Sequence, residues 1–244
     1  MKIIMILLIL ANTAYSKSAE INSNLWREIS VDITDYAAMQ RGAVLFFNKC
    51  SGCHNLEHER YDKLAKGIGI VDNGDLMTDV VKSGLIKTGD KLTDVIMNSA
   101  DPALFSKWFG IVPPDLTNII RVRGANWVYN YLRGFYNDPS KQWGVNNIVF
   151  DGVGMPNILE DLSGTYKPVY GDNGKLVDIS KIKEGLLSTN EFDLSMQDLV
   201  TFLTYVSEPI AVERTRIGVF VIFSLLVLSI FTWLVKREYW KDLH

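Results

Sequence analysis

The segment CSGCH at residues 50–54 constrains this chain more than any other feature, because it contains both cysteines among the 244 residues. Two thiols separated by two residues can reach the two vinyl groups on one edge of a haem, while the imidazole of the adjacent His54 meets the iron. We therefore predict one covalent haem c, attached at Cys50 and Cys53, with His54 as the proximal iron ligand. The chain must then fold around a large, flat, mostly apolar group.

Other uses of a cysteine pair fit the sequence less well. A thioredoxin-like redox pair does not need the histidine. A zinc site needs further cysteines or clustered histidines, and the other histidines are only His58 and His244. Two cysteines also exclude the disulfide framework of a small secreted domain. Covalent haem is the interpretation that uses every chemically active residue of the motif.

The N-terminus has the layout of a secretory signal. Lys2 precedes an apolar run over residues 3–11, and Ala14 and Ser16 place small side chains at the positions that a signal peptidase inspects. We predict that residues 1–16 are a signal peptide. A buried N-terminal strand or helix is the alternative.

Near the C-terminus, residues 217–235 form an uncharged apolar run. At about 1.5 Å per residue, a helix of this length spans a hydrocarbon core of about 30 Å. Residues suited to the membrane interfaces flank or end the run: Arg214, Arg216, Trp233, Lys236, Arg237, Tyr239 and Trp240. The predicted order in a bacterial inner membrane is a signal peptide (1–16), a periplasmic haem domain (17–213), a single transmembrane anchor (214–236) and a cytoplasmic tail (237–244).

The exported part of the chain is acidic. Residues 17–213 contain 19 Lys and Arg against 26 Asp and Glu, a net charge of −7. Ordinary solubility explains such a charge, and so does an acidic face that steers a cationic redox partner. The sequence leaves both explanations open.

Helical spacing of apolar residues predicts a mainly α domain with long connections rich in Gly and Asp, which can pack against a haem. We expect one helix before the cysteines, with Thr34 or Asp35 as its cap. The other expected helices run from Pro113 to a stop at Gly124, over residues 127–135 with an interruption at Gly134, and from Ser195, paired with Asp198, to Pro209.

The sixth iron ligand is an open position, a second histidine or a methionine. His58 is one helical turn from His54, and His244 lies beyond the anchor, so neither suits the opposite haem face. Met155 stands in the segment DGVGMP, where two glycines and a proline shape a loop that can present sulfur to a metal. The remaining candidates fit helices or core filling: Met39, Met77, Met97 and Met196. Spacing alone therefore favours Met155.

Taken together, the motifs resemble those of the cytochrome c1 family, the haem-c subunit of the cytochrome bc1 (ubiquinol–cytochrome c oxidoreductase) complex, especially in proteobacteria. The resemblance covers nearly the whole exported domain. It is carried by RG at 41–42, CSGCH at 50–54, PPDL at 113–116, RVR at 121–123, YLRGFY at 131–136, GMP at 154–156 and EP at 208–209.

The resemblance implies a class I cytochrome c-like haem domain with Met155 as the distal ligand. It further implies that Arg123 stands near a haem propionate, although a solvated arginine on a helix face is the alternative, and that Pro114 and Ile119 line the haem pocket. Asn157 departs from the family, many of whose members have a second proline there.

By the same resemblance, the chain is not an enzyme by itself. It accepts electrons from a Rieske iron–sulfur protein and passes them to cytochrome c, beside cytochrome b and membrane lipid in a dimeric complex, with no nucleic acid partner. Rival interpretations are a haem subunit of a terminal oxidase or nitric oxide reductase, a haem enzyme or gas sensor with an open iron position, and a purely structural membrane subunit.

Overall fold

The computed structural model describes residues 25–86, 89–98 and 100–241, so the predicted signal peptide and His244 lie outside the described residues. The described chain divides into two compact units. We call residues 31–128 and 194–241 the helical unit, and residues 25–30 and 129–193 the hairpin unit. The boundaries fall within helices α7 (Ala125–Arg133) and α9 (Thr189–Ser207).

Helix α2 (Tyr36–Lys49) is the element of the helical unit that leads to the cysteines. Its predicted cap is confirmed, since the Asp35 carboxylate accepts a hydrogen bond from Ala38 N at 3.0 Å. Met39, Ala43 and Phe46 recur on one face and are buried. This burial gives the helix a fixed orientation in the unit.

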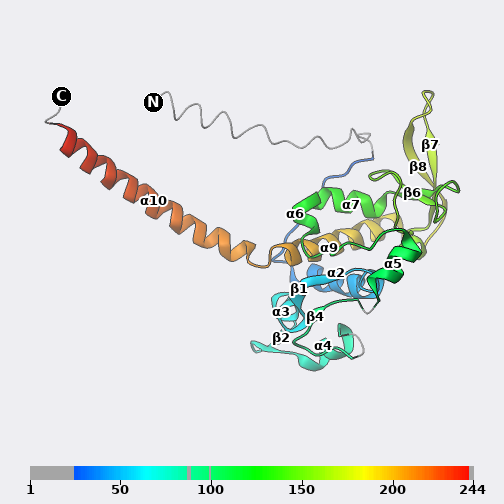
Figure 1. The fold of residues 1–244 in the computed structure, drawn as a ribbon, viewed down its shortest axis with the longest axis horizontal. Coiled ribbons are helices and arrows are strands. Elements are labelled where there is room, and N and C mark those ends of the chain that lie inside the picture. Colours follow the sequence, from blue (N-terminus) through cyan, green and yellow to red (C-terminus); the bar gives the residue numbers. More distant parts are fainter. Residues whose placement is uncertain (1–24, 87–88, 99, 242–244) are drawn as a thin grey trace. The chain divides into compact units, whose positions relative to one another are not determined.

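Helix α2 lies against α9 in the helical unit (Figure 1). The approach is close, because a Cβ atom at Gly42 would lie 2.2 Å from the carbonyl oxygen of Asp198. The Arg41 guanidinium makes two bonds to the Asp198 carboxylate, at 2.6 and 2.9 Å. Only glycine at position 42 permits this contact, and the adjacent ion pair fixes its register.

The remaining elements of the helical unit are short. They are β1 (Leu56–Arg60), α3 (Tyr61–Gly67), β2 (Val71–Asp72), β3 (Asp75–Leu76), α4 (Thr78–Gly84), β4 (Val95–Ile96), α5 (Pro102–Phe109) and α6 (Ile119–Arg123). Strands β1 and β4 pair antiparallel, with Leu56 opposite Ile96. Both of these side chains are fully buried. The long connections that the sequence predicted are therefore partly organised as two-stranded ribbons.

Helix α6 begins later than predicted. The expected start was Pro113, but the helix runs from Ile119 to Arg123. The residues before Ile119 make hydrogen bonds that are not helical. Leu116 N donates to Asn55 O at 3.0 Å, and Thr117 N donates to the Asp115 carboxylate at 2.9 Å. The predicted stop is confirmed, because Gly124 has a φ of +87°, which residues with a side chain rarely adopt.

The hairpin unit contains antiparallel ribbons next to the C-terminal part of α7. They pair β5 (Phe135–Asn137) with β6 (Val145–Asn147), and β7 (Thr165–Tyr170) with β8 (Leu176–Lys183), and the short helix α8 (Glu160–Ser163) lies between β6 and β7 in the chain. Phe135, Val145 and Val153 form a buried apolar cluster against which Tyr131 and Met155 pack. The end of α7 at Arg133 confirms the predicted interruption at Gly134.

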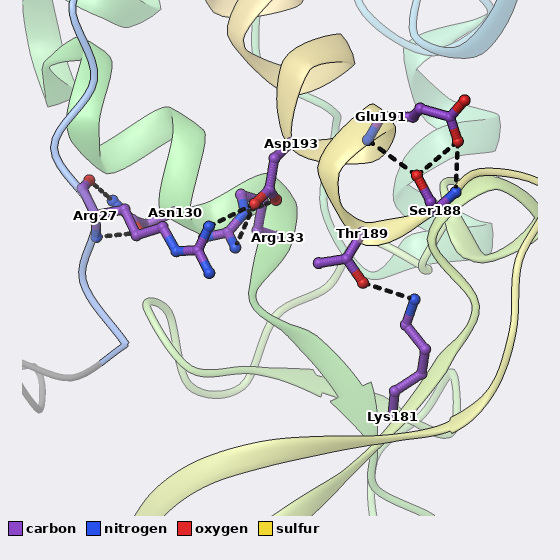
Figure 2. A network of polar contacts seen from close by, with 8 residues as sticks. All are labelled: Arg27, Asn130, Arg133, Lys181, Ser188, Thr189, Glu191 and Asp193. Carbon is purple, nitrogen blue, oxygen red and sulfur yellow. Dashed lines mark hydrogen bonds and ion pairs between the residues drawn. The ribbon is translucent and has the colours of Figure 1, made fainter.

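Helix α9 begins at Thr189, so the predicted start at Ser195 is wrong. The capping pair is Ser188 and Glu191: the Ser188 amide and hydroxyl donate to the Glu191 carboxylate at 2.9 and 2.6 Å (Figure 2). Ser195 and Asp198 repeat the same spacing within the helix, where Asp198 binds Arg41 instead. Two candidate capping pairs seven residues apart look alike in the sequence.

A polar network ties the N-terminal segment of the hairpin unit to its helices (Figure 2). The Arg27 main chain exchanges hydrogen bonds with the Asn130 side chain at 2.9 and 2.7 Å. The Asp193 carboxylate binds Arg27 and Arg133, each at 2.5 Å. Asn130 is almost fully buried, so its two bonds to main-chain atoms hold residue 27 in place.

Helix α10 (Ala211–Trp240) confirms the prediction of one C-terminal apolar helix. It is the one helix among the described residues with the length and composition to cross a membrane, and its side chains are not buried by the chain itself. Glu208 precedes it and binds Arg214 at 2.5 and 2.8 Å and Arg121 at 3.8 Å. These ion pairs link the first turn of α10 to α6.

Candidate haem-binding site

The two cysteines lie in a single turn that continues from the end of α2. Cys50 is the C-cap of the helix, and its amide donates to Phe46 O at 2.8 Å. The amides of Cys53 and His54 both donate to Cys50 O, at 3.1 and 3.0 Å. Main-chain bonds alone therefore bring the two thiols and the imidazole together, as attachment to one haem edge requires.

Neither cysteine forms a disulfide, and Cys50 is buried while Cys53 is partly exposed. Burial, and to a lesser extent the neighbouring Cys53, raises the pKa of the Cys50 thiol to about 12. The Cys50 thiol is thus protonated at neutral pH. The pair fits two thioether bonds to a haem, since neither sulfur is used in a disulfide.

The orientation of His54 is set by a main-chain carbonyl. His54 Nδ1 lies 2.7 Å from Pro114 O, and because a carbonyl oxygen can only accept, Nδ1 carries the proton. Burial lowers the pKa of His54, against opposing effects of the Pro114 bond and of Asp115. The imidazole is therefore neutral and keeps the Nε2 lone pair for a metal, which is the form that a proximal haem ligand needs.

Asn55 and Asn98 hold the chain that follows His54. The Asn98 side chain donates to Cys53 O at 3.0 Å and to the Asn55 side-chain oxygen at 2.6 Å. The Asn98 amide also donates to that oxygen, at 2.7 Å. Sequence reasoning missed both asparagines, because they are 43 residues apart and nothing local marks them as partners.

The other residues predicted for the helical unit lie on or before α6. The Pro114 ring is exposed and Ile119 is half-buried. The Arg123 guanidinium is exposed and stacks 4.9 Å from the centre of the Trp127 ring. The structure thus connects Pro114 to His54 by a hydrogen bond, while the described contacts of Arg123 are with an aromatic ring.

Met155 belongs to the hairpin unit, where it packs beside the buried cluster of Phe135, Val145 and Val153. The Tyr131 hydroxyl donates a hydrogen bond to the Met155 sulfur at 3.5 Å. Burial raises the pKa of the Tyr131 phenol, which therefore stays protonated at neutral pH. The thioether accordingly has a hydrogen-bond donor placed against it within its own unit.

The loop that carries Met155 is fixed by Asn146, a residue that is only 3% exposed. Its side-chain oxygen accepts from Gly152 N at 3.0 Å and from Asn147 N at 2.9 Å. Its side-chain nitrogen donates to the carboxylates of Asp151 at 2.7 Å and Asp138 at 3.2 Å. This one side chain uses nearly all its hydrogen-bonding capacity to shape the loop.

Asn157, where the sequence departs from the family pattern, also has a local role. Its side-chain oxygen accepts from Leu159 N at 3.2 Å, as in an Asx turn. The turn therefore replaces the conformational restriction that a proline would supply. Among the described residues, no group of three or more His, Cys, Asp or Glu side chains could hold a metal ion.

Comparisons with known proteins identify a matching family and several relatives. The model of the Cytochrome C1 family matches residues 26–243. Cytochrome c1 of Allochromatium vinosum is 42% identical over 221 residues, which cover 88% of each chain. The ammonia monooxygenase gamma subunit of Nitrosomonas europaea is 36% identical over 214 residues, covering 88% of this chain and 87% of that protein. The mitochondrial cytochrome c1 of Neurospora crassa is 28% identical over 226 residues, covering 84% of this chain and 62% of that protein.

Proposed function

Since the chain belongs to the cytochrome c1 family, we propose that it accepts electrons from a Rieske iron–sulfur protein and delivers them to a cytochrome c. Members of this family bind one covalent haem c and transfer electrons as a subunit of the cytochrome bc1 complex. The observation that best supports the proposal is the turn at residues 50–54, where two thiols outside any disulfide adjoin a histidine whose Nδ1 is bonded to Pro114 O at 2.7 Å.

The proposed haem contacts follow from the donor groups. Cys50 and Cys53 hold the haem through thioether bonds, His54 supplies Nε2 to the iron, and Met155 supplies its sulfur. Pro114 orients the imidazole through its carbonyl and, with Ile119, excludes water from the haem. When bound, the haem supplies a one-electron ferric/ferrous couple, whose potential a methionine ligand and burial raise.

Arg123 is the proposed partner of a haem propionate. Its guanidinium is exposed and is held over the Trp127 ring, so it can bind a carboxylate without losing that stacking contact. No proton transfer or bond cleavage is required of this chain. The residues need only hold the couple in one geometry in both oxidation states.

The proposed location follows from the segments. A signal peptide (1–16) exports the haem domain (17–213) to the periplasm, the anchor (214–236) crosses the inner membrane within α10, and the tail (237–244) stays in the cytoplasm. The net charge of −7 on the exported part supports a cationic acceptor. Cytochrome b, lipid and a second copy of the complex complete the proposed surroundings.

Purification with a tag after residue 244 tests this function. Extraction in a mild detergent should recover a diheme cytochrome b and a Rieske protein, and the preparation should reduce cytochrome c with quinol, more slowly as salt rises. An untagged strain is the control. Recovery with a haem–copper oxidase or a monooxygenase, or as a lone subunit in several detergents, would contradict the proposed partners. Recovery with a monooxygenase is a relevant outcome because one relative is named an ammonia monooxygenase subunit.

A further inference from the structure

We propose that Tyr131 is a positioning residue for Met155, and that its hydroxyl raises the haem potential by donating a hydrogen bond to the ligand sulfur. This inference rests on the proposed function, in which Met155 binds the iron. It concerns a residue that the sequence marked only as part of a helix and of a family motif. The contact itself, O–H to sulfur at 3.5 Å, lies wholly within the hairpin unit.

The position of the Tyr131 hydroxyl is fixed from two sides. Its ring meets the Phe135 ring edge to face, with centroids 5.3 Å apart and an interplanar angle of 71°. Its main-chain carbonyl accepts a hydrogen bond from the Asn147 side chain at 2.8 Å. Phe135 and Asn147 are both buried, so neither support moves freely. The donor is thus held by buried groups of the hairpin unit itself.

The sulfur that receives this bond is also held. Met155 packs against the buried cluster of the unit, and Asn146 fixes its loop through Gly152 N and the Asp151 carboxylate. A thioether has two lone pairs. One can therefore bind iron while the other accepts from Tyr131, so the hydrogen bond and the iron bond do not compete for the same electrons.

The direction of the effect follows from charge. A hydrogen bond to sulfur draws electron density away from the lone pair that faces the iron, and ferric iron loses more from a weaker donor than ferrous iron does. The bond therefore stabilises the reduced state relative to the oxidised state. Removing it should lower the potential and strengthen the bond between sulfur and ferric iron.

Tyr131→Phe in the full-length holoprotein is the decisive variant, because it removes the hydroxyl and keeps the ring on Phe135. Tyr129→Phe is the matched control: Tyr129 is a buried tyrosine on the same helix, whose ring lies under the Arg133 guanidinium at 5.1 Å. In redox titrations, Tyr131→Phe should raise the ratio of ferric to ferrous haem severalfold at a fixed ambient potential. A tenfold change corresponds to 59 mV for one electron.

Two further measurements keep the outcomes distinct. The methionine-to-iron charge-transfer band should persist in Tyr131→Phe, and added imidazole should displace the ligand from its ferric haem more slowly than from wild type. Suppose that Met155→Leu abolishes the band, as the proposed ligand requires. The role of Tyr131 would then be overturned if Tyr131→Phe left the redox titration unchanged, or if Tyr131→Phe itself lost the band. If Met155→Leu itself keeps the band and the potential, the proposed ligand is wrong and the inference fails with it.

Discussion

The turn at residues 50–54 and the loop that carries Met155 are held in different ways. In the helical unit, main-chain hydrogen bonds place Cys53 and His54 one turn after α2, and a main-chain carbonyl orients the imidazole. In the hairpin unit, the side chains of Asn146 and Tyr131 shape and contact the loop of Met155. The first arrangement depends mainly on main-chain hydrogen bonds and the second on particular side chains. The two regions should therefore respond differently to substitution.

Removal of both thiols should have the largest effect of any substitution in the two regions. Cys50→Ala combined with Cys53→Ala should abolish covalent haem, because no other cysteine exists in the chain. Ser51→Ala is the control within the same turn: it removes the hydroxyl bond to Phe47 O at 2.8 Å but leaves both thiols. Haem staining on a denaturing gel is the measurement. Staining that survives in the double variant would exclude the proposed attachment.

On the methionine side, Met155→Leu should leave haem attached and lower the midpoint potential by about 100 mV or more, since the axial ligand is a main determinant of the potential. The charge-transfer band of the oxidised protein should disappear. Met77→Leu changes a 41% exposed methionine of the helical unit and should alter neither property. Redox titration of both variants gives the comparison, and equal potentials would place the ligand elsewhere.

A smaller change in the same loop separates placement of the ligand from its chemistry. Asn146→Ala removes the hydrogen bonds that a side chain only 3% exposed makes to its partners, and a typical bond of this kind contributes about 0.5–1.5 kcal/mol. Because those partners include Gly152 N and Asp151, the loss should fall on the loop and weaken the charge-transfer band without removing haem. Asn130→Ala, at another buried asparagine of the hairpin unit, should lower stability but keep the band. Equal bands in both variants would argue against a specific role for Asn146.

The smallest expected effect concerns Glu59 on β1, whose side chain is 8% exposed. Burial, partly offset by His58, raises the pKa of Glu59 to about 7. The folded state then favours the protonated form, so its stabilising effect is present below the unfolded value near 4.5 and is lost as the pH rises through 7. At pH 8 the free energy of unfolding of Glu59→Gln should exceed that of wild type by on the order of 1–2 kcal/mol. The difference between the two proteins should be smallest at pH 5.

Denaturant unfolding of the full chain in detergent at both pH values measures this difference. Glu57→Gln is the control, because Glu57 is an exposed neighbour on the same strand. Haem attachment should be unchanged in both variants. The same pH dependence in wild type and Glu59→Gln would show that another group is responsible.

Local patterns predicted the parts of the molecule that local forces determine. The cap at Asp35, the stops at Gly124 and Arg133 and the apolar helix α10 all follow from neighbouring residues. The turn at residues 50–54 also depends on neighbouring residues, since the amides of Cys53 and His54 donate to Cys50 O. The family model matches residues 26–243, so the resemblance to the family extends well beyond the haem motif.

One failure has a long-range cause and the other a local one. Pro113 did not start a helix because Leu116 bonds to Asn55, and Ser195 did not cap α9 because Ser188 and Glu191 do so earlier. The bond from His54 to Pro114 O spans 60 residues, and no residue pattern announces it. Side-chain supports such as Asn146 are equally invisible in the sequence, because an asparagine in a loop ordinarily predicts only a turn.

The most direct test of the proposed iron ligands is iron K-edge X-ray absorption of the oxidised full-length protein. This measurement reports the atoms bound to the metal without any substitution. We expect one sulfur ligand from Met155 and nitrogen ligands from the porphyrin and His54. A matched measurement on Met155→Leu should lose the sulfur contribution. A wild-type iron with nitrogen ligands alone, or with only five ligands, would contradict the proposal that His54 and Met155 bind the iron.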